Sequence, residues 1–225
     1  MWRTGPLPNG TVSYTRLVSA SRVHLIRHGE VENPHHVVYA DLPGYGLSPL
    51  GMDQARATSA HLAAAPVAMV MSSPLLRALQ TANEIAACHG LGVQIDESLT
   101  EWAVGTRWAG VRWEDLDEVF PGELTAYLQH PHDMPFASET LAQCGSRVAE
   151  AILAAAGRID GDLVVVSHQD PIHAGHLHLT AESPDHYHAD KPTHASIVTL
   201  QPAAEAWLQI SYWEPEQGER FPPVE

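Results

Sequence analysis

Short apolar runs alternate with longer stretches of helical periodicity along most of this chain. The runs with the length of buried strands are 22–27, 67–72, 92–95 and 162–168. The stretches with helical spacing are 48–65, 73–90 and about 138–157. Two further apolar runs, 195–202 and 206–213, are typical of a closing antiparallel pair. This order predicts an α/β fold, a three-layer sandwich in which helices cover both faces of a mostly parallel central sheet.

Two of the predicted helices begin with recognisable signals. Ser48 precedes Pro49 at the start of the first helix, and Ser73 precedes Pro74 at the start of the second. Serine is a favoured N-cap residue and proline is favoured in the first turn, so Ser48 and Ser73 are the expected caps. Gly90 follows the second helix and marks its end.

The same pattern divides the chain into three parts. Residues 1–21 lack the apolar block of a signal peptide and are expected to form a loose leader. Residues 22–202 form the predicted main domain, whose irregular, aromatic and acidic segment 96–136 is expected to cap one sheet edge; 203–225 supply a C-terminal strand and tail. No apolar stretch approaches the roughly 20 residues that cross a bilayer. We therefore expect a soluble protein of the cytoplasm.

The charge balance narrows the possible partners. The chain has 225 residues and a formal net charge of −15, and Lys191 is its only lysine. Nucleic acids and anionic membranes require a basic face, so neither is an expected partner. Cys88 and Cys144 are the only cysteines and are expected to be free thiols. An anionic ligand would have to be bound by a few individually placed arginines.

Polar residues with suitable chemistry stand where predicted strands end. Arg27 and His28 complete the run 22–27, and His168 ends the run 162–168. Arg77 lies in the first turn of the helix that follows another predicted strand, the run 67–72. Each histidine alone could be a simple polar strand end. Together they predict an anion site, because ligands of open α/β sheets bind beyond the carboxyl ends of the strands and helix N-termini favour anions. Gly29 is expected to let the backbone turn or approach the anion.

Four motifs in order carry a family resemblance: "RHGE", "SSPLLRALQTA", "LTEWAVG" and "VVVSH". From about residue 22 to 200, the chain resembles the histidine phosphatase superfamily, also called phosphoglycerate mutase-like. The resemblance implies that His28 is the nucleophile that accepts a phosphoryl group. Arg27, Arg77 and a protonated His168 would complete the phosphate pocket, and Glu101 would be the proton donor. Imidazole can attack phosphorus without a metal, so the resemblance implies no cofactor and no metal.

Other site assignments leave alternatives open. Asp96 and Glu97 lie close to Glu101 and could take its role. The resemblance offers further substrate contacts, although Gln169 could simply cap the next helix. These candidates are Asn33, Gln169 and Glu139.

Two features bear on the reaction. The segment from Asp96 to Glu123 has eight carboxylates against Arg107 and Arg112, which favours a phosphatase of a small phosphorylated metabolite over a mutase that must bind a second anionic group. A mutase and a catalytically silent phospho-ligand binder remain the alternatives, and a homodimer is possible. Within the histidine-rich segment 168–194, His173, His176 and His178 are spaced so that some could share a helix face and bind a metal, although loop histidines are common and the carboxylates or cysteines of a firm site are absent.

Overall fold

The computed structural model describes residues 20–188 and 190–220, so most of the predicted leader and the last five residues of the tail lie outside the described residues. Within the described chain, seven strands form one sheet in the order β3-β2-β4-β1-β5-β6-β7. β3, β2, β4 and β1 run parallel, and β5, β6 and β7 continue antiparallel. The strands are β1 (Ala20–Arg27), β2 (Val67–Ser72), β3 (Val93–Ile95), β4 (Gly161–Ser167), β5 (Ile197–Pro202), β6 (Trp207–Glu214) and β7 (Gly218–Arg220).

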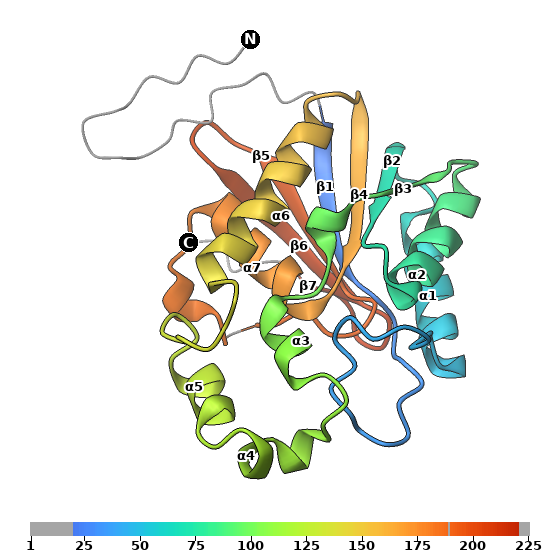
Figure 1. Ribbon diagram of the computed structural model, residues 1–225. Helices are drawn as coiled ribbons and strands as arrows, with labels where there is room; N and C mark the ends of the chain where they lie inside the picture. Colours follow the sequence, from blue (N-terminus) through green and yellow to red (C-terminus); the bar gives the residue numbers. More distant parts are fainter. Residues whose placement is uncertain (1–19, 189, 221–225) are drawn as a thin grey trace.

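Helices cover both faces of this sheet. Figure 1 shows α6 and α7 on one face, with α1 and α2 on the other. Their bounds are α1 (Pro49–Leu62), α2 (Leu76–Cys88), α6 (Leu141–Ala156) and α7 (Gln169–Thr180). The predicted fold class and the predicted antiparallel pair of β5 with β6 are therefore confirmed.

The run of apolar residues in β4 explains why two helical layers are needed. Leu163 and Val165 belong to the cluster that packs under α6 and α7, whereas Val164 and Val166 face the cluster under α1 and α2. All four side chains are fully buried. Since successive side chains of a strand point to opposite faces, a continuous apolar run requires cover on both sides.

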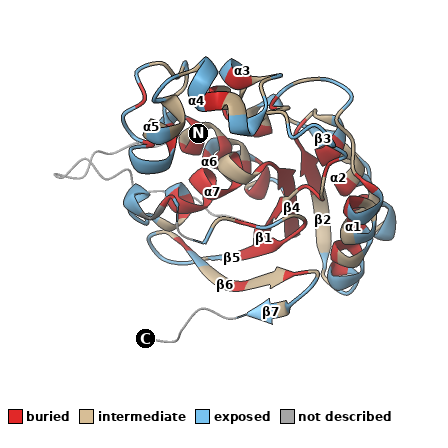
Figure 2. Cartoon of the chain, turned by 90° about the horizontal axis from the view of Figure 1, so that it is seen from below, coloured by how far each residue is buried: buried red, intermediate tan, exposed pale blue. Residues whose placement is uncertain are grey.

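The segment 96–136 folds as a cap of short helices. Figure 2 shows a concentration of buried residues in the sheet and on the inner sides of the surrounding helices. The cap has an apolar cluster of its own, in which Trp102, Trp108 and Leu116 meet Ala174 and Leu177 of α7. The short elements are η1 (Glu97–Leu99), α3 (Ala103–Trp108), η2 (Trp113–Asp115), α4 (Leu116–Val119), α5 (Glu123–Gln129) and, after α7, η3 (Pro184–His186). None of the helices in the described residues is long and apolar enough to span a membrane.

The helix starts agree only in part with the sequence signals. Ser48 caps α1 as predicted, because its hydroxyl accepts a hydrogen bond from Gly51 N at 3.0 Å. Ser73 does not cap α2; the helix begins at Leu76 after an N-cap residue whose side chain makes no capping bond. α6 begins three residues later than expected. Thr140 and Gln143 form a capping box at that point.

Candidate active site

The carboxyl ends of three neighbouring strands bring the candidate residues together. His28 N donates to Ser167 O at 3.0 Å, which fixes the end of β1 beside the end of β4. Gly29 follows, and a β-carbon there would lie 2.5 Å from the backbone oxygen of Gly51. Close packing against the start of α1 therefore requires this glycine. Its expected contact with an anion stays a prediction. Ser73 N donates to Val166 O at 3.0 Å and places the end of β2 at the same edge.

The imidazole of His28 is held in one tautomer. Its Nε2 lies 3.2 Å from Arg77 Nε, and because a guanidinium can only donate, Nε2 is the acceptor. Nδ1 then carries the proton and donates to Gly29 O at 2.7 Å. Burial, and the charges of His168, Arg77 and Arg27, lower the pKa of His28 well below its ordinary value. The ring is therefore neutral near pH 7, with a lone pair on Nε2.

Arg77 is fully buried although it carries a charge. Besides His28, its Nη2 donates to Ala40 O at 2.6 Å, and its guanidinium lies 4.7 Å from the ring centroid of Tyr39. A buried guanidinium of this kind is costly without an anion or several acceptors nearby. These contacts place Arg77 Nε at the lone pair of His28 Nε2, which accepts its hydrogen bond.

The two terminal nitrogens of Arg27 are hydrogen-bonded, whereas its Nε is not bonded within the described chain. Its Nη1 donates to Pro192 O at 3.0 Å, and its Nη2 donates to His194 Nε2 at 2.8 Å. Its buried Nε has no hydrogen-bond partner among the described residues. Burial and the charge of Arg27 lower the pKa of His194 to about 3, so this imidazole remains an acceptor. No pattern in the sequence indicated this role of His194.

His168 lies beside His28, with the two ring centroids 5.2 Å apart, and is fully buried. Its Nε2 lies 2.8 Å from Ser73 Oγ, and this contact takes the hydroxyl that was expected to cap α2. Its buried Nδ1 has no hydrogen-bond partner among the described residues and lies 3.8 Å from Glu101 Oε2. Burial, followed by the charges of Arg77 and Arg27, lowers the pKa of His168 well below its ordinary value. A neutral ring is thus expected near pH 7, contrary to the protonated form expected from the sequence; a bound phosphate dianion would raise this pKa again.

Glu101 supplies a carboxyl group at the edge of this cluster. Its Oε1 accepts from Trp102 N at 2.9 Å, and 18% of the side chain is exposed. Burial, assisted by the negative charge of Asp170, raises the pKa of Glu101 to about 7. The carboxyl group can therefore give and take a proton near neutral pH. Of the three carboxylates considered, Glu101 is a pocket-lining residue, whereas Asp96 accepts from Ser98 N at 2.8 Å and Glu97 is exposed.

Glu139 lies in a different place from the one predicted. Its carboxylate pairs with Arg147, with Oε1 2.5 Å from Nε and Oε2 3.1 Å from Nη2. Arg147 also donates to Ser98 O at 2.6 Å and to Glu101 O at 3.3 Å. Glu139 therefore helps to hold the segment that carries Glu101 and is not among the residues lining the pocket.

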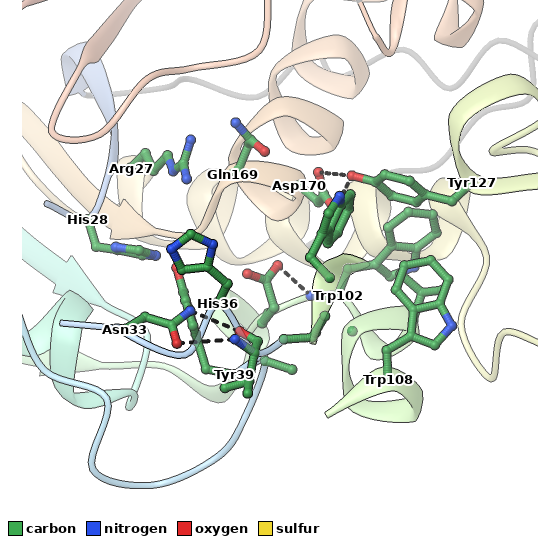
Figure 3. Close-up of a pocket in the computed structure, with 17 residues that line it drawn as sticks. Arg27, His28, Asn33, His36, Tyr39, Trp102, Trp108, Tyr127, Gln169 and Asp170 are labelled. Atoms are coloured by element: carbon green, nitrogen blue, oxygen red, sulfur yellow. Dashed lines mark hydrogen bonds between the residues drawn. The ribbon is translucent and has the colours of Figure 1, made fainter. Parts of the chain in front are cut away.

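The cluster opens into a pocket of about 420 Å³ between the sheet edge and the cap (Figure 3). Three tryptophans and two tyrosines line it together with Arg27, His28 and Glu101; these aromatic residues are Tyr39, Trp102, Trp108, Trp113 and Tyr127. Asn33 and Gln169, two of the candidates for substrate contacts, also line the pocket. However, the amide of Asn33 is bonded at both ends to the backbone of Val37, at 2.9 and 3.2 Å.

A metal site in the histidine-rich segment 168–194 receives no support from the geometry. Among the described residues, no three histidine, cysteine, aspartate or glutamate side chains are grouped so that they could hold a metal ion. His173 and His176 pack together with their ring centroids 6.1 Å apart, and both are buried in α7.

Comparison with known proteins confirms the resemblance. The family model for the histidine phosphatase superfamily (branch 1) matches residues 23–214. The chain belongs to this superfamily. "Uncharacterized protein Rv0525" of Mycobacterium tuberculosis is 36% identical over 163 residues, which cover 72% of this chain and 80% of that protein. Phosphoserine phosphatase 1 of Hydrogenobacter thermophilus is 32% identical over 152 residues, 67% of this chain and 72% of the relative.

A solved structure shows the same similarity in three dimensions. The mycobacterial glucosyl-3-phosphoglycerate phosphatase Rv2419c, in complex with VO3, matches with a TM-score of 0.76 at 25% identity. The match covers 84% of this chain and 96% of the other. This histidine phosphatase chain is thus similar to enzymes named as phosphatases of small phosphorylated metabolites.

Several pocket residues of this histidine phosphatase were not predicted. His36 and Tyr39 come from the long loop after β1, which has no periodicity to place its side chains. Tyr127 comes from α5, and Asp170 from the first turn of α7. Only Asp170 had a signal, since it stands two residues after His168.

Proposed function

We propose that this protein is a phosphomonoesterase that hydrolyses a small phosphorylated metabolite through a phosphohistidine intermediate on His28. The observation that carries the proposal is the arrangement around His28 Nε2. The neutral imidazole has its Nε2 lone pair there. Nearby, Arg27 Nε is a buried donor, and His168 Nδ1 becomes one when an anion raises the pKa of that ring; neither atom has a partner among the described residues. Buried donors of this kind favour an anion, and phosphoryl oxygens would satisfy them.

In the first step, His28 Nε2 attacks phosphorus and the bond from phosphorus to the ester oxygen breaks. Arg27, Arg77 and His168 hold the phosphoryl oxygens and stabilise the charge that develops on them. The Nε2 lone pair currently accepts from Arg77 Nε, so this donor turns to a phosphoryl oxygen as the substrate enters. Glu101 gives its proton to the departing oxygen, and the alcohol leaves.

In the second step, the phosphohistidine is hydrolysed. Glu101, now a carboxylate, takes a proton from water as the water oxygen attacks phosphorus. The bond between phosphorus and Nε2 breaks, inorganic phosphate leaves, and His28 is neutral again. A pKa of about 7 suits both roles of Glu101, because it is close to the pH at which the group must work.

The cap supports a phosphatase over a mutase. Arg107 makes a bidentate pair with Glu123, at 2.7 to 3.0 Å, and Arg112 pairs with Glu114. Neither arginine is among the residues that line the pocket. A second anionic group on the substrate would therefore meet few free cations in the cap, which favours a neutral or cationic leaving group.

A panel of phosphate monoesters tests the proposal, with inorganic phosphate release as the measurement. We expect turnover by the wild-type chain and its loss in His28→Ala, with an acid-labile phosphoryl group trapped on the wild-type chain by rapid quenching. Exchange between phosphoglycerate isomers without net phosphate release would indicate a mutase instead. Binding of phosphorylated ligands with no His28-dependent release from any ester would indicate a silent binder.

A further inference from the structure

The far side of the pocket carries a carboxylate that the chemistry at phosphorus does not use. Asp170 lies in the first turn of α7 and lines the pocket. In Figure 3 it lies with Tyr127 on the side away from His28, and Gln169 lies between. Its side chain is mostly buried, with 14% exposed. Burying a carboxylate is costly, so its partners decide whether it is ionised.

Three neighbouring side chains, Lys191, Tyr187 and Tyr127, keep Asp170 ionised. Lys191 Nζ donates to Oδ1 at 2.9 Å, and the Tyr127 hydroxyl donates to Oδ2 at 3.1 Å. Burial alone would raise the pKa of Asp170, but the Lys191 charge and these hydrogen bonds outweigh it and hold the pKa below its ordinary value. Asp170 is therefore an anion near pH 7.

The cation of this pair stands behind the carboxylate. Lys191 Nζ lies 4.1 Å from the ring centroid of Tyr187 and 4.9 Å from that of Tyr127, and Lys191 is not among the lining residues. A carboxylate offers about four acceptor positions, of which Lys191 and Tyr127 use part. The pocket is therefore lined at this end by an ionised hydrogen-bond acceptor, Asp170, beside aromatic side chains such as Tyr127.

We propose that Asp170 forms a subsite for a hydrogen-bond donor on the leaving group, an ammonium or a hydroxyl, and so selects amino-alcohol or polyol phosphates. This inference rests on the proposed phosphomonoesterase activity. An apolar group at this place would leave the acceptor positions that face the pocket without water or a donor, and a carboxylate on the substrate would meet a like charge. Asp170 is then a specificity-determining residue that does not touch the phosphoryl group; its charge acts on the transfer only through the pKa of Glu101.

Matched esters isolate this contact. Aminoalkyl, hydroxyalkyl, alkyl and carboxyalkyl phosphates of equal length, in a two-carbon and a four-carbon series, differ only in the terminal group. We expect the wild-type chain to prefer the amino or hydroxy ester to the alkyl ester by about tenfold or more in kcat/KM at one of the two lengths, since a hydrogen bond to a charged group contributes on the order of ten- to a hundredfold. The carboxyalkyl ester is expected to be the poorest substrate.

Asp170→Asn, with Asp117→Asn as its control, assigns the preference to one residue. Asp117 is exposed in α4, so its replacement removes the same formal charge outside the pocket. We expect the ratio of amino to alkyl ester to fall by about tenfold in Asp170→Asn and to stay unchanged in Asp117→Asn. Any effect of Asp170 on Glu101 acts on both esters alike and cancels in the ratio.

The outcomes separate the two proposals. A wild-type ratio near one at both lengths, or an equal ratio in Asp170→Asn, overturns the subsite while His28-dependent hydrolysis still supports the phosphatase. Absence of His28-dependent release from every ester overturns the phosphatase, and the subsite with it.

Discussion

Replacing Glu101 with glutamine tests the charge state on which the proposed mechanism depends. The carboxyl group lies in a mostly buried place beside the ionised Asp170, and both features disfavour its anion. Glutamine has nearly the same shape, and its amide oxygen can still accept from Trp102 N. The substitution therefore removes the titrating proton and leaves the local packing in place.

The size of the effect follows from the pKa of Glu101, about 7 against the usual 4.5. At about 1.4 kcal/mol per pKa unit, this difference corresponds to roughly 3 kcal/mol. Between pH 4.5 and 7 the folded chain holds a proton on Glu101 that the unfolded chain has lost. The contribution of this residue to stability therefore declines as pH rises through this window. Glutamine does not titrate, so the stability of Glu101→Gln lacks this decline with pH.

Denaturant unfolding at pH 4 to 8.5 measures this difference directly. We expect the free energy of unfolding of Glu101→Gln, relative to the wild-type chain, to rise by about 3 kcal/mol from pH 4 to pH 8. Glu97→Gln is the matched control, because it removes an exposed carboxyl group from the same segment. Its pH profile should run parallel to that of the wild-type chain.

Activity gives a second measure of the same proton. For alkyl phosphates, wild-type kcat/KM should fall above about pH 7 as Glu101 ionises. In Glu101→Gln this alkaline limb should vanish, with a loss on the order of a hundredfold, and aryl phosphates that leave without a proton should lose less. The reasoning is refuted if the two unfolding profiles stay parallel between pH 4.5 and 7, or if full turnover of alkyl phosphates survives in Glu101→Gln.

Three further substitutions test how the fold supports the site. His194→Leu removes the acceptor of Arg27 Nη2 and should lower kcat/KM about tenfold, through a higher KM. His194→Asn supplies an amide oxygen as acceptor, so its kcat/KM should stay within about threefold of the wild-type value. Equal losses of kcat/KM in the two variants would refute the positioning role of His194. Gly175→Ala places a β-carbon 2.5 Å from a side-chain carbon of α6 and should cost about 1–3 kcal/mol in denaturant unfolding, while Gly92→Ala, which meets nothing within 4 Å, should be nearly neutral. Thr140→Ala breaks the capping box of α6 and should cost about 1 kcal/mol, seen as a lower Tm; an unchanged Tm would contradict it.

The four residues of the proposed phosphate site could be predicted to lie together because each follows the end of a strand. Arg27 and His28 follow β1 directly, His168 follows β4, and Arg77 lies in the first turn after β2. Parallel strands bring such positions to the same sheet edge. A local pattern is therefore sufficient to predict these positions, because the parallel pairing of β4 with β1 and β2 brings them together.

Two errors of prediction have a shared cause. Ser73 has the sequence of a helix cap, yet its hydroxyl contacts His168 and α2 begins later. Glu139 lies in a stretch similar to a site motif, yet Arg147 pairs with it and ties it to the backbone of Glu101. In both cases a partner distant in sequence competes for the side chain, and a local signal contains no information about that partner.

By itself, the sequence determined the order of strands and helices, the two buried faces of the sheet and the four residues at its carboxyl edge. These follow from side-chain periodicity and from chain continuity, which are local properties. Only the tertiary structure decided the far side of the pocket, where Tyr127 and Asp170 come from separate segments, and the contact of His194 with Arg27. It also decided the charge states, because the pKa of Glu101 depends on burial and on Asp170 across the pocket. The arrangement of these residues and their charge states depend on how the cap and the loop after α7 pack over the sheet edge. That packing results from many contacts between residues distant in sequence.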